Sequence, residues 1–318
     1  MDSTTQQRKQ QRTETPSPEV DDKPDITKRR RSSQLDLLSG SSMHADDPNV
    51  QEMLARLSTD EVETAARATY EYVKHPSLQT RDAYAARVCR RYLESKHGDV
   101  DLATEKVKST LQFRRDYDLE GIMKAFEDPN SDYAAPLQKN LSDRKFYVQG
   151  FDREGRSTLF FIPRCTRSFD KEWHLKEALY SIERAIACSK AGDSTINAVV
   201  DFSGFSLTKH CPPIDIGKEF LTTLRSHYAG QINKIFLLDC PTSFSMLWTI
   251  FSPFVGTNTR DKIKFLSGDN SKSELTDLYD LGEMPSFMCP GGKKNRELDI
   301  EEYLFDIPFD QAFDDTHQ

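Results

Sequence analysis

The sequence predicts an α/β protein with a mostly parallel, twisted sheet that follows a small all-helical subdomain. From about residue 145, short apolar runs rich in β-branched and aromatic residues alternate with longer segments of helical spacing. Strands that alternate with helices imply right-handed crossovers and a mostly parallel sheet. Between residues 50 and 126, apolar residues instead recur at helical spacing.

We expect four segments along the chain. Residues 1–49 form a disordered tail, because so few apolar residues cannot repay the entropy of ordering. Residues 50–126 form the helical subdomain, and residues 127–295 form the α/β domain. Residues 296–318 form an acidic tail, in which we expect one short helix near Leu298 to Leu304 before the chain frays.

The first segment contains a basic run, Lys28 to Arg31, which two serines follow directly. Such a run suits a basic-directed kinase site, a contact with anionic lipid or a localisation signal. A solvated charge run in a disordered tail has the same composition. These interpretations stay open.

Composition excludes several classes of protein. A net charge of −8 argues against a broad nucleic-acid interface, so we expect no nucleic-acid partner. The six cysteines form no CxxC pair and the N-terminus is not apolar, which indicates reduced thiols in the cytoplasm. No apolar run is long and clean enough to span a bilayer, so membrane contact should be peripheral. We expect a monomer.

The helical subdomain is predicted from three groups of apolar residues and one start signal. Thr59 to Glu63 is typical of the beginning of a helix, and Gly98 ends the second group. The apolar positions at helical spacing are Val50, Met53, Leu54 and Leu57, then Tyr84, Val88, Tyr92 and Leu93, then Leu102, Val107, Leu111 and Phe113.

The α/β domain is predicted from strands and helices in alternation. Its strand-like runs are residues 146–148, 158–162, 196–202, 235–238 and 262–266. The intervening helical segments are residues 171–190, 220–228 and 273–279. Asp152 to Arg156 is a turn sequence between the first two strands. Continuous apolar strands fit a sheet that is covered on both faces.

The stretch from Cys240 to Thr259 has no charged residue and no histidine, in a chain with 30% charged residues. At helical spacing its large apolar side chains cover most of the circumference, whereas a surface helix should carry a charged face. Pro241, Pro253 and Gly256 argue against a membrane-spanning helix. Two interpretations remain: a buried core helix, or a helix that is covered at one time and meets an apolar surface at another.

No arrangement of residues predicts covalent chemistry. The sequence has no GxSxG elbow, P-loop, HExxH motif or Cys/His metal spacing. His210 and Cys211 invite comparison with a phosphatase nucleophile, but Gly217 stands where that signature needs an arginine. We therefore predict that the protein is not an enzyme and has no catalytic residue, metal or cofactor.

Several motifs, in order, resemble the CRAL-TRIO family, which includes the yeast phosphatidylinositol/phosphatidylcholine transfer proteins. The resemblance covers about residues 50 to 295, and each motif is short, so their order is what makes the match specific. The motifs are the FRRDY segment at 113–117, the DxxGR turn at 152–156, the DxxGxS signature at 201–206, the segment from Ile235 to Ile263, Met284-Pro285 and Gly291-Gly292.

The family fold implies an apolar pocket for one lipid, which is bound as a ligand, beneath a mobile gate helix that corresponds to residues 244–255 here. The resemblance implies head-group contacts from two hydroxyls and a lysine, which match Ser206, Thr208 and Lys262, with Thr259 as a further contact. Hydroxyl donors and one cation suit a phosphodiester. The expected gate and pocket residues are Phe244, Leu247, Trp248, Ile250, Phe251, Phe254 and Val255.

The sequence departs from the family pattern at Gly230. The family has a glutamate there that helps to hold inositol, so we expect poor discrimination for an inositol ring. Two functions follow from the resemblance. The protein transfers a phospholipid or other hydrophobic ligand, including phosphatidylinositol as a candidate, between membrane surfaces that it contacts transiently. Alternatively, it is an adaptor that reports lipid occupancy to a protein partner without net transfer.

Overall fold

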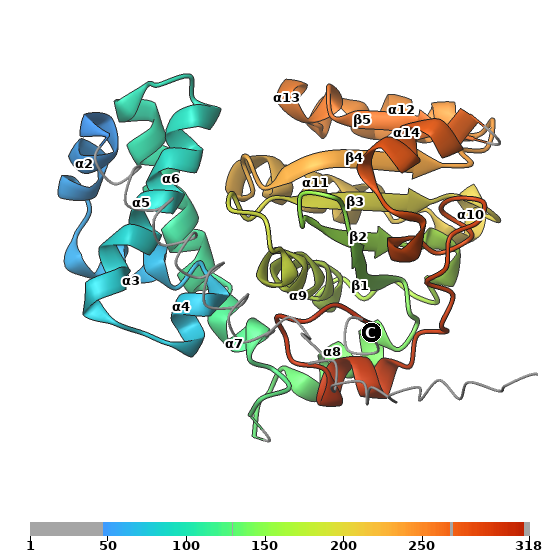
Figure 1. Ribbon diagram of the computed structural model, residues 1–318, viewed down its shortest axis with the longest axis horizontal. Helices are drawn as coiled ribbons and strands as arrows, with labels where there is room; N and C mark the ends of the chain where they lie inside the picture. Colours follow the sequence, from blue (N-terminus) through green and yellow to red (C-terminus); the bar gives the residue numbers. More distant parts are fainter. Residues whose placement is uncertain (1–46, 129, 268–269, 315–318) are drawn as a thin grey trace, which may run out of the picture. The chain divides into compact units, whose positions relative to one another are not determined.

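The computed structural model describes residues 47–128, 130–267 and 270–314 (Figure 1). The basic run at Lys28 to Arg31 lies outside these residues. The boundaries predicted at residues 49, 126 and 295 stay predictions.

A helical region precedes the sheet, as predicted. Its helices are α2 (Pro48–Ala55), α3 (Thr59–Ala66), α4 (Tyr70–Lys74), α5 (Leu78–Ser95), α6 (Val100–Asp116) and α7 (Leu119–Met123). Ser58 starts α3 with a capping box, in which its hydroxyl accepts from the Glu61 amide and the Glu61 carboxylate accepts from the Ser58 amide. Most of the apolar positions predicted from spacing pack together, with Met53, Val88 and Leu111 fully or almost fully buried. The prediction is wrong for Leu102, which is 41% exposed on the first turn of α6.

The sheet has five strands in the spatial order β1-β2-β3-β4-β5. The strands are β1 (Phe146–Phe151), β2 (Ser157–Phe161), β3 (Ile196–Asp201), β4 (Ile232–Leu238) and β5 (Ile263–Leu266). β1 pairs with β2 antiparallel, and the other pairs are parallel. The predicted fold class is therefore confirmed. The remaining α-helices are α8 (Ala134–Leu141), α9 (Trp173–Cys188), α10 (Leu207–His210), α11 (Ile214–His227), α12 (Phe244–Phe251), α13 (Thr257–Arg260) and α14 (Asn270–Leu278).

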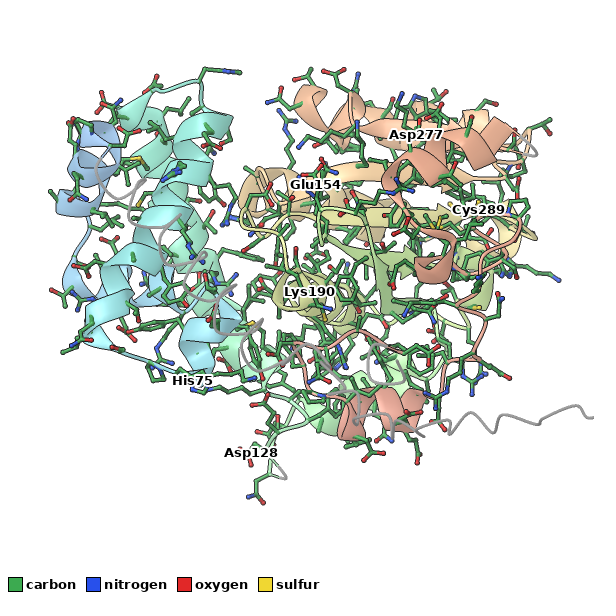
Figure 2. All side chains as sticks on the ribbon, in the orientation of Figure 1. His75, Asp128, Glu154, Lys190, Asp277 and Cys289 are labelled. Atoms are coloured by element: carbon green, nitrogen blue, oxygen red, sulfur yellow. The ribbon has the colours of Figure 1, made fainter. Side chains whose placement is uncertain are left out.

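Side chains fill the space between the sheet and the segments around it (Figure 2). On one face, Phe160, Val199 and Phe236 pack against the segment from Leu275 to Cys289. On the other face, α9 covers β1 and β2 and contributes Leu175, Leu179 and Ile182 to the largest core cluster. The alternation of side chains along each strand separates these two cores.

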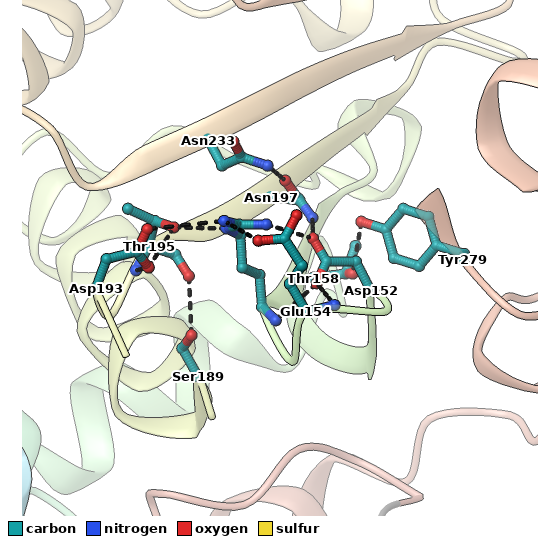
Figure 3. Close-up of polar contacts among 10 residues, drawn as sticks. Asp152, Glu154, Thr158, Ser189, Asp193, Thr195, Asn197, Asn233 and Tyr279 are labelled. Carbon is teal, nitrogen blue, oxygen red and sulfur yellow. Dashed lines mark hydrogen bonds and ion pairs between the residues drawn. The ribbon is translucent and has the colours of Figure 1, made fainter. Parts of the chain in front are cut away.

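The DxxGR turn is a structural anchor of the sheet (Figure 3). The Asp152 carboxylate accepts from the amides of Glu154 and Arg156, and it also accepts from the buried Asn197 side chain at 2.8 Å. Gly155 has a φ of +84°, which a residue with a side chain rarely adopts. The motif thus fixes the β1–β2 turn to β3 through buried, satisfied polar groups.

The expectation that the C-terminal segment frays after Leu304 is wrong for the part that the structure describes. Phe309 and Phe313 are buried in the core, and the Phe313 amide donates to Val148 of β1. Arg184 of α9 is fully buried and donates to the carbonyl oxygens of Tyr303 and Ile307. This segment therefore pairs with β1 at one point and shields that edge of the sheet.

Candidate functional site

One face of the sheet carries two rows of apolar side chains that run across all the strands. The register aligns Val148, Leu159, Ala198, Ile235 and Ile263 in one row, and Phe146, Phe161, Val200, Leu237 and Phe265 in the other. Both rows are well buried at β1, where α9 covers them, and less buried toward β5, where Phe265 is 56% exposed. Parallel sheets normally have both faces covered, so this part of the face is an unusual apolar surface.

Helix α12 packs on the less covered part of this face. Phe244 is buried against Phe202 and Leu237. The ring centroids of Phe244 and Phe202 are 4.9 Å apart. Phe265 meets Phe244 and Trp248 edge-on, with centroids 5.8 and 6.0 Å away. These contacts explain why the side of α12 that faces the sheet has no charge, because a charge there would be desolvated without a partner.

The predicted gate residues divide into three groups by exposure. Phe244 and Phe251 are buried, whereas Leu247, Trp248, Phe254 and Val255 are half-buried. Ile250 is 42% exposed, and the neighbouring Met246 is 64% exposed. Helix α12 thus has one side on the sheet and another apolar side facing outward. Whether it moves as a gate stays a prediction.

Sequence analysis missed the contacts that hold the end of α12. Gly217 of α11 leaves space for the Phe251 ring: a methyl group there would lie 2.4 Å from Phe251 Cε1. Arg260 of α13 donates to the carbonyl oxygens of Ser252 and Val255. Gly217 lies before the predicted helical segment at residues 220–228, so the sequence offers no signal for the first contact.

Ser206 and Thr208 lie together at the carboxyl end of β3. Their hydroxyl oxygens are 3.1 Å apart, and the Ser206 amide donates to Nδ1 of His210. Thr208 is exposed and Ser206 is half-buried. Two adjacent hydroxyls can donate to one phosphate oxygen, and this role stays a prediction.

Lys262 and Thr259 lie at the opposite end of the parallel strands. Lys262 immediately precedes β5, and its Nζ donates to the carbonyl oxygen of Ile232 at the start of β4. Burial lowers the pKa of Lys262, while Asp193 acts in the opposite direction. At about 3.3 Å per residue, the strands separate this end from Ser206 by more than about 13 Å. The structure does not bring the four predicted head-group residues together, so the two pairs are separate candidate contacts.

Gly230 cannot readily be replaced by a residue with a side chain. Its φ is +76°, and a Cβ atom at this position would lie 2.7 Å from Cγ of Arg91 on α5. The space next to Gly230 is therefore filled by the Arg91 stem. This packing explains why glycine stands where the family pattern has a glutamate.

Two hollows lie elsewhere in the described part of the chain. One, of about 160 Å³, is lined by α9 and the C-terminal segment, including Arg184 and Phe305. The other, of about 430 Å³, is lined by α2, α3 and α5, including Leu54 and Val62. Neither hollow is lined by a predicted gate or head-group residue. Because α12 packs directly on the sheet, lipid binding beneath it stays a prediction that requires α12 to shift.

Comparison with known protein families identifies the α/β region. Residues 141–288 match the family described as the CRAL/TRIO domain. This part of the chain is similar to CRAL/TRIO domains. The matched range contains all five strands, α12 and every predicted head-group residue. The expectation drawn from the order of the motifs is confirmed.

Curated relatives share this domain at low identity. The chain is 26% identical to the SEC14 cytosolic factor of Candida glabrata over 237 residues, which cover 68% of this chain and 74% of the relative. It is 25% identical to a CRAL-TRIO domain-containing protein of Schizosaccharomyces pombe, over 55% of this chain but 16% of that relative. The alignment with the protein real-time of Anopheles gambiae likewise spans 31% of the relative, at 23% identity.

A solved structure shows the same fold. The crystal structure of Sfh5 superimposes with a TM-score of 0.55 at 14% identity, covering 81% of this chain and 92% of that one. Likeness at this identity concerns the fold alone. Within the described part of the chain, no helix is both long and apolar enough to cross a bilayer.

Proposed function

We propose that this protein binds one lipid between the apolar sheet face and α12 and transfers it between membranes. The observation that carries the proposal is the pair of apolar rows, which remain partly uncovered near Phe265 and extend beneath a helix without charge. Burying such a surface against acyl chains is favourable at about 25 cal/mol per Å² of apolar area. Relatives named as phosphatidylinositol/phosphatidylcholine transfer protein and phosphatidylinositol transfer protein support lipid as the ligand class.

The head group should meet polar residues at one end of the strands. Ser206 and Thr208 supply two neutral donors at the carboxyl end, and Lys262 supplies a cation at the amino end. We expect the Ser206 and Thr208 pair to hold the phosphate of a phospholipid. The packing of Arg91 on Gly230 supports weak discrimination for an inositol ring.

Exchange of labelled lipid between two vesicle populations tests the function. A transfer protein moves many lipids per molecule, whereas an adaptor binds one lipid without turnover. Lipid extraction from the purified protein, followed by mass spectrometry, should recover about one lipid per chain. Protein that contains no extractable lipid and takes none from vesicles would contradict lipid binding altogether.

The head-group assignment has its own test. Ser206→Ala with Thr208→Val should weaken binding of a phospholipid by about 1–3 kcal/mol, because two hydrogen bonds are lost. Lys262→Ala should weaken the binding of an anionic phospholipid more than the binding of a neutral one. A neutral apolar ligand that lacks phosphate is the control. If the binding of the anionic phospholipid, the neutral phospholipid and the apolar control were weakened equally, these residues would support the fold instead.

A further inference from the structure

We propose that Arg260 and Lys218 form a clasp that fastens the carboxyl end of α12 and that an anionic membrane surface releases it. This inference rests on the proposed transfer function, because it assigns the signal that opens the same site. The clasp consists of the two cations and of the end of α12 and its extension, residues 251–255.

The first part of the clasp is Arg260. Its guanidinium donates to the carbonyl oxygens of Ser252 and Val255, which follow α12 directly and belong to the end of the uncharged stretch. The Ser252 carbonyl also accepts from the Val255 amide in the turn that follows α12, so Arg260 adds a second donor to Ser252 and supplies a donor to Val255. Its side chain is exposed.

The second part is Lys218 on α11. Its Nζ lies 5.3 Å from the centroid of the Phe254 ring, within cation–π range. One position earlier, Gly217 provides the space that receives Phe251. Adjacent residues of α11 therefore hold two aromatic side chains at the end of the gate.

With α12 closed on the sheet, Arg260 and Lys218 both interact with uncharged groups, which are weak partners for a cation. In the part of the chain that the structure describes, no carboxylate lies within ion-pair distance of Arg260 or Lys218. Hydrogen bonds in which an anion accepts from a cation are roughly twice as strong as bonds between neutral groups. Lipid phosphates and carboxylates therefore compete well with a backbone carbonyl and an aromatic ring.

The adjacent apolar surface specifies a membrane as the source of the anion. Met246 and Ile250 on α12 are 64% and 42% exposed, and Ile214 at the start of α11 is 59% exposed. Interfacial binding combines apolar burial with attraction of basic residues to anionic lipid. A soluble anion offers no apolar phase to these side chains. The chain as a whole carries a net charge of −8, so the attraction must be local.

Fluorescence of Trp248 reports the clasp without any lipid transfer. The chain has two tryptophans, so Trp173→Phe leaves Trp248 as the reporter. Vesicles with brominated acyl chains quench this tryptophan when α12 meets the bilayer. We expect stronger quenching with phosphatidylserine in the vesicle than with phosphatidylcholine alone, on the order of fivefold for each cation that engages the surface.

Arg260→Ala should increase quenching on neutral vesicles and reduce the phosphatidylserine dependence on the order of fivefold. Lys218→Ala should act in the same direction. Lys264→Ala is the matched control, because Lys264 lies on the other face of β5 and pairs with Glu274 at 3.9 Å. Lys264→Ala should behave as the unchanged protein.

Three results would overturn the clasp. Arg260→Ala could keep the original dependence, Lys264→Ala could shift as much as Arg260→Ala, or inorganic phosphate alone could produce the same change in Trp248 emission. Vesicle exchange, measured in parallel, separates the two proposals. An unchanged Arg260→Ala response in a protein that exchanges lipid rejects the clasp alone, whereas an altered response without any exchange rejects transfer alone.

Discussion

Replacing Gly217 by alanine tests whether the end of α12 is held by a specific contact. The added methyl group would lie 2.4 Å from Cε1 and 2.7 Å from Cζ of Phe251. Real side chains do not approach so closely, and Gly217 is inside a helix that cannot shift locally without losing hydrogen bonds. The Phe251 ring must therefore leave its position.

Two free-energy terms of opposite sign decide the result. Exposing a Phe-sized side chain costs about 1.5–3 kcal/mol, and Phe251 is 8% exposed in the closed arrangement. Replacing glycine by alanine inside a helix stabilises it by about 1 kcal/mol. The expected net result is a decrease of about 0.5–2 kcal/mol in the free energy of unfolding. If only α12 detaches from its neighbours, the mobility of α12 increases instead.

Urea unfolding, with Trp248 emission as a second signal, measures both outcomes. The matched background is Phe251→Ala, in which the methyl group at position 217 meets no ring. There Gly217→Ala should raise the free energy of unfolding by up to about 1 kcal/mol. Equal destabilisation in both backgrounds would show that the contact between Gly217 and Phe251 is not what limits this position.

Three further substitutions probe other parts of the fold. Arg184→Met should lower the free energy of unfolding by about 2–4 kcal/mol and expose the C-terminal segment to proteases, because the Tyr303 carbonyl loses its donor; an unchanged urea midpoint would contradict this anchoring. Asn197→Ala should cost about 2 kcal/mol in the same assay, since the buried Asp152 carboxylate loses a donor; a neutral result would mean that water replaces the amide. Burial lowers the pKa of His227 from 6.5 to about 4, so the unfolded chain binds a proton first as the pH falls. Stability should decline from about pH 6.5 to about pH 4; His227→Gln should flatten that decline, and a parallel decline in both proteins would assign it to other groups.

The sheet was predictable because each strand is an apolar run with few competing signals. The positions of β3 and β4 follow from Ile196 to Phe202 and from Ile235 to Leu238, which are short, bounded and mostly apolar. The family motifs then fixed the order of elements. Shorter helices such as α8 and α10 were not predicted, because a few residues carry too little periodicity.

The C-terminal segment was misjudged because composition and spacing pointed in different directions. Its acidic residues suggested a solvated tail, but Tyr303, Phe309 and Phe313 recur at intervals that bring all three rings into the core. Arg184 gave no signal either, since a charged residue beside Glu183 on a helix is usually exposed. A buried arginine is tolerated there because backbone carbonyls, which no sequence pattern displays, accept its hydrogen bonds.

The separation of the predicted head-group residues could have been deduced from chain order. Ser206 follows β3, whereas Lys262 precedes β5, and these strands are parallel. Residues after one parallel strand and before another lie at opposite edges of the sheet. The family resemblance grouped the residues by function and so concealed their geometry. A lipid that reaches both ends must extend along the strands.

The contacts of α12 have the magnitude that a transient lid requires. Its closed position is held by two buried rings, Phe244 and Phe251, at about 1.5–3 kcal/mol each, and by exposed hydrogen bonds from Arg260 at about 0.5–1.5 kcal/mol each. On a membrane, Met246 and Ile250 enter the interface, and each basic residue near an anionic leaflet contributes about 1 kcal/mol. The free energy that holds α12 closed and the free energy gained when it contacts a membrane are equal within a few kcal/mol. We predict that a helix balanced in this way opens where lipid is present and closes in water, which a helix fixed in the core could not do.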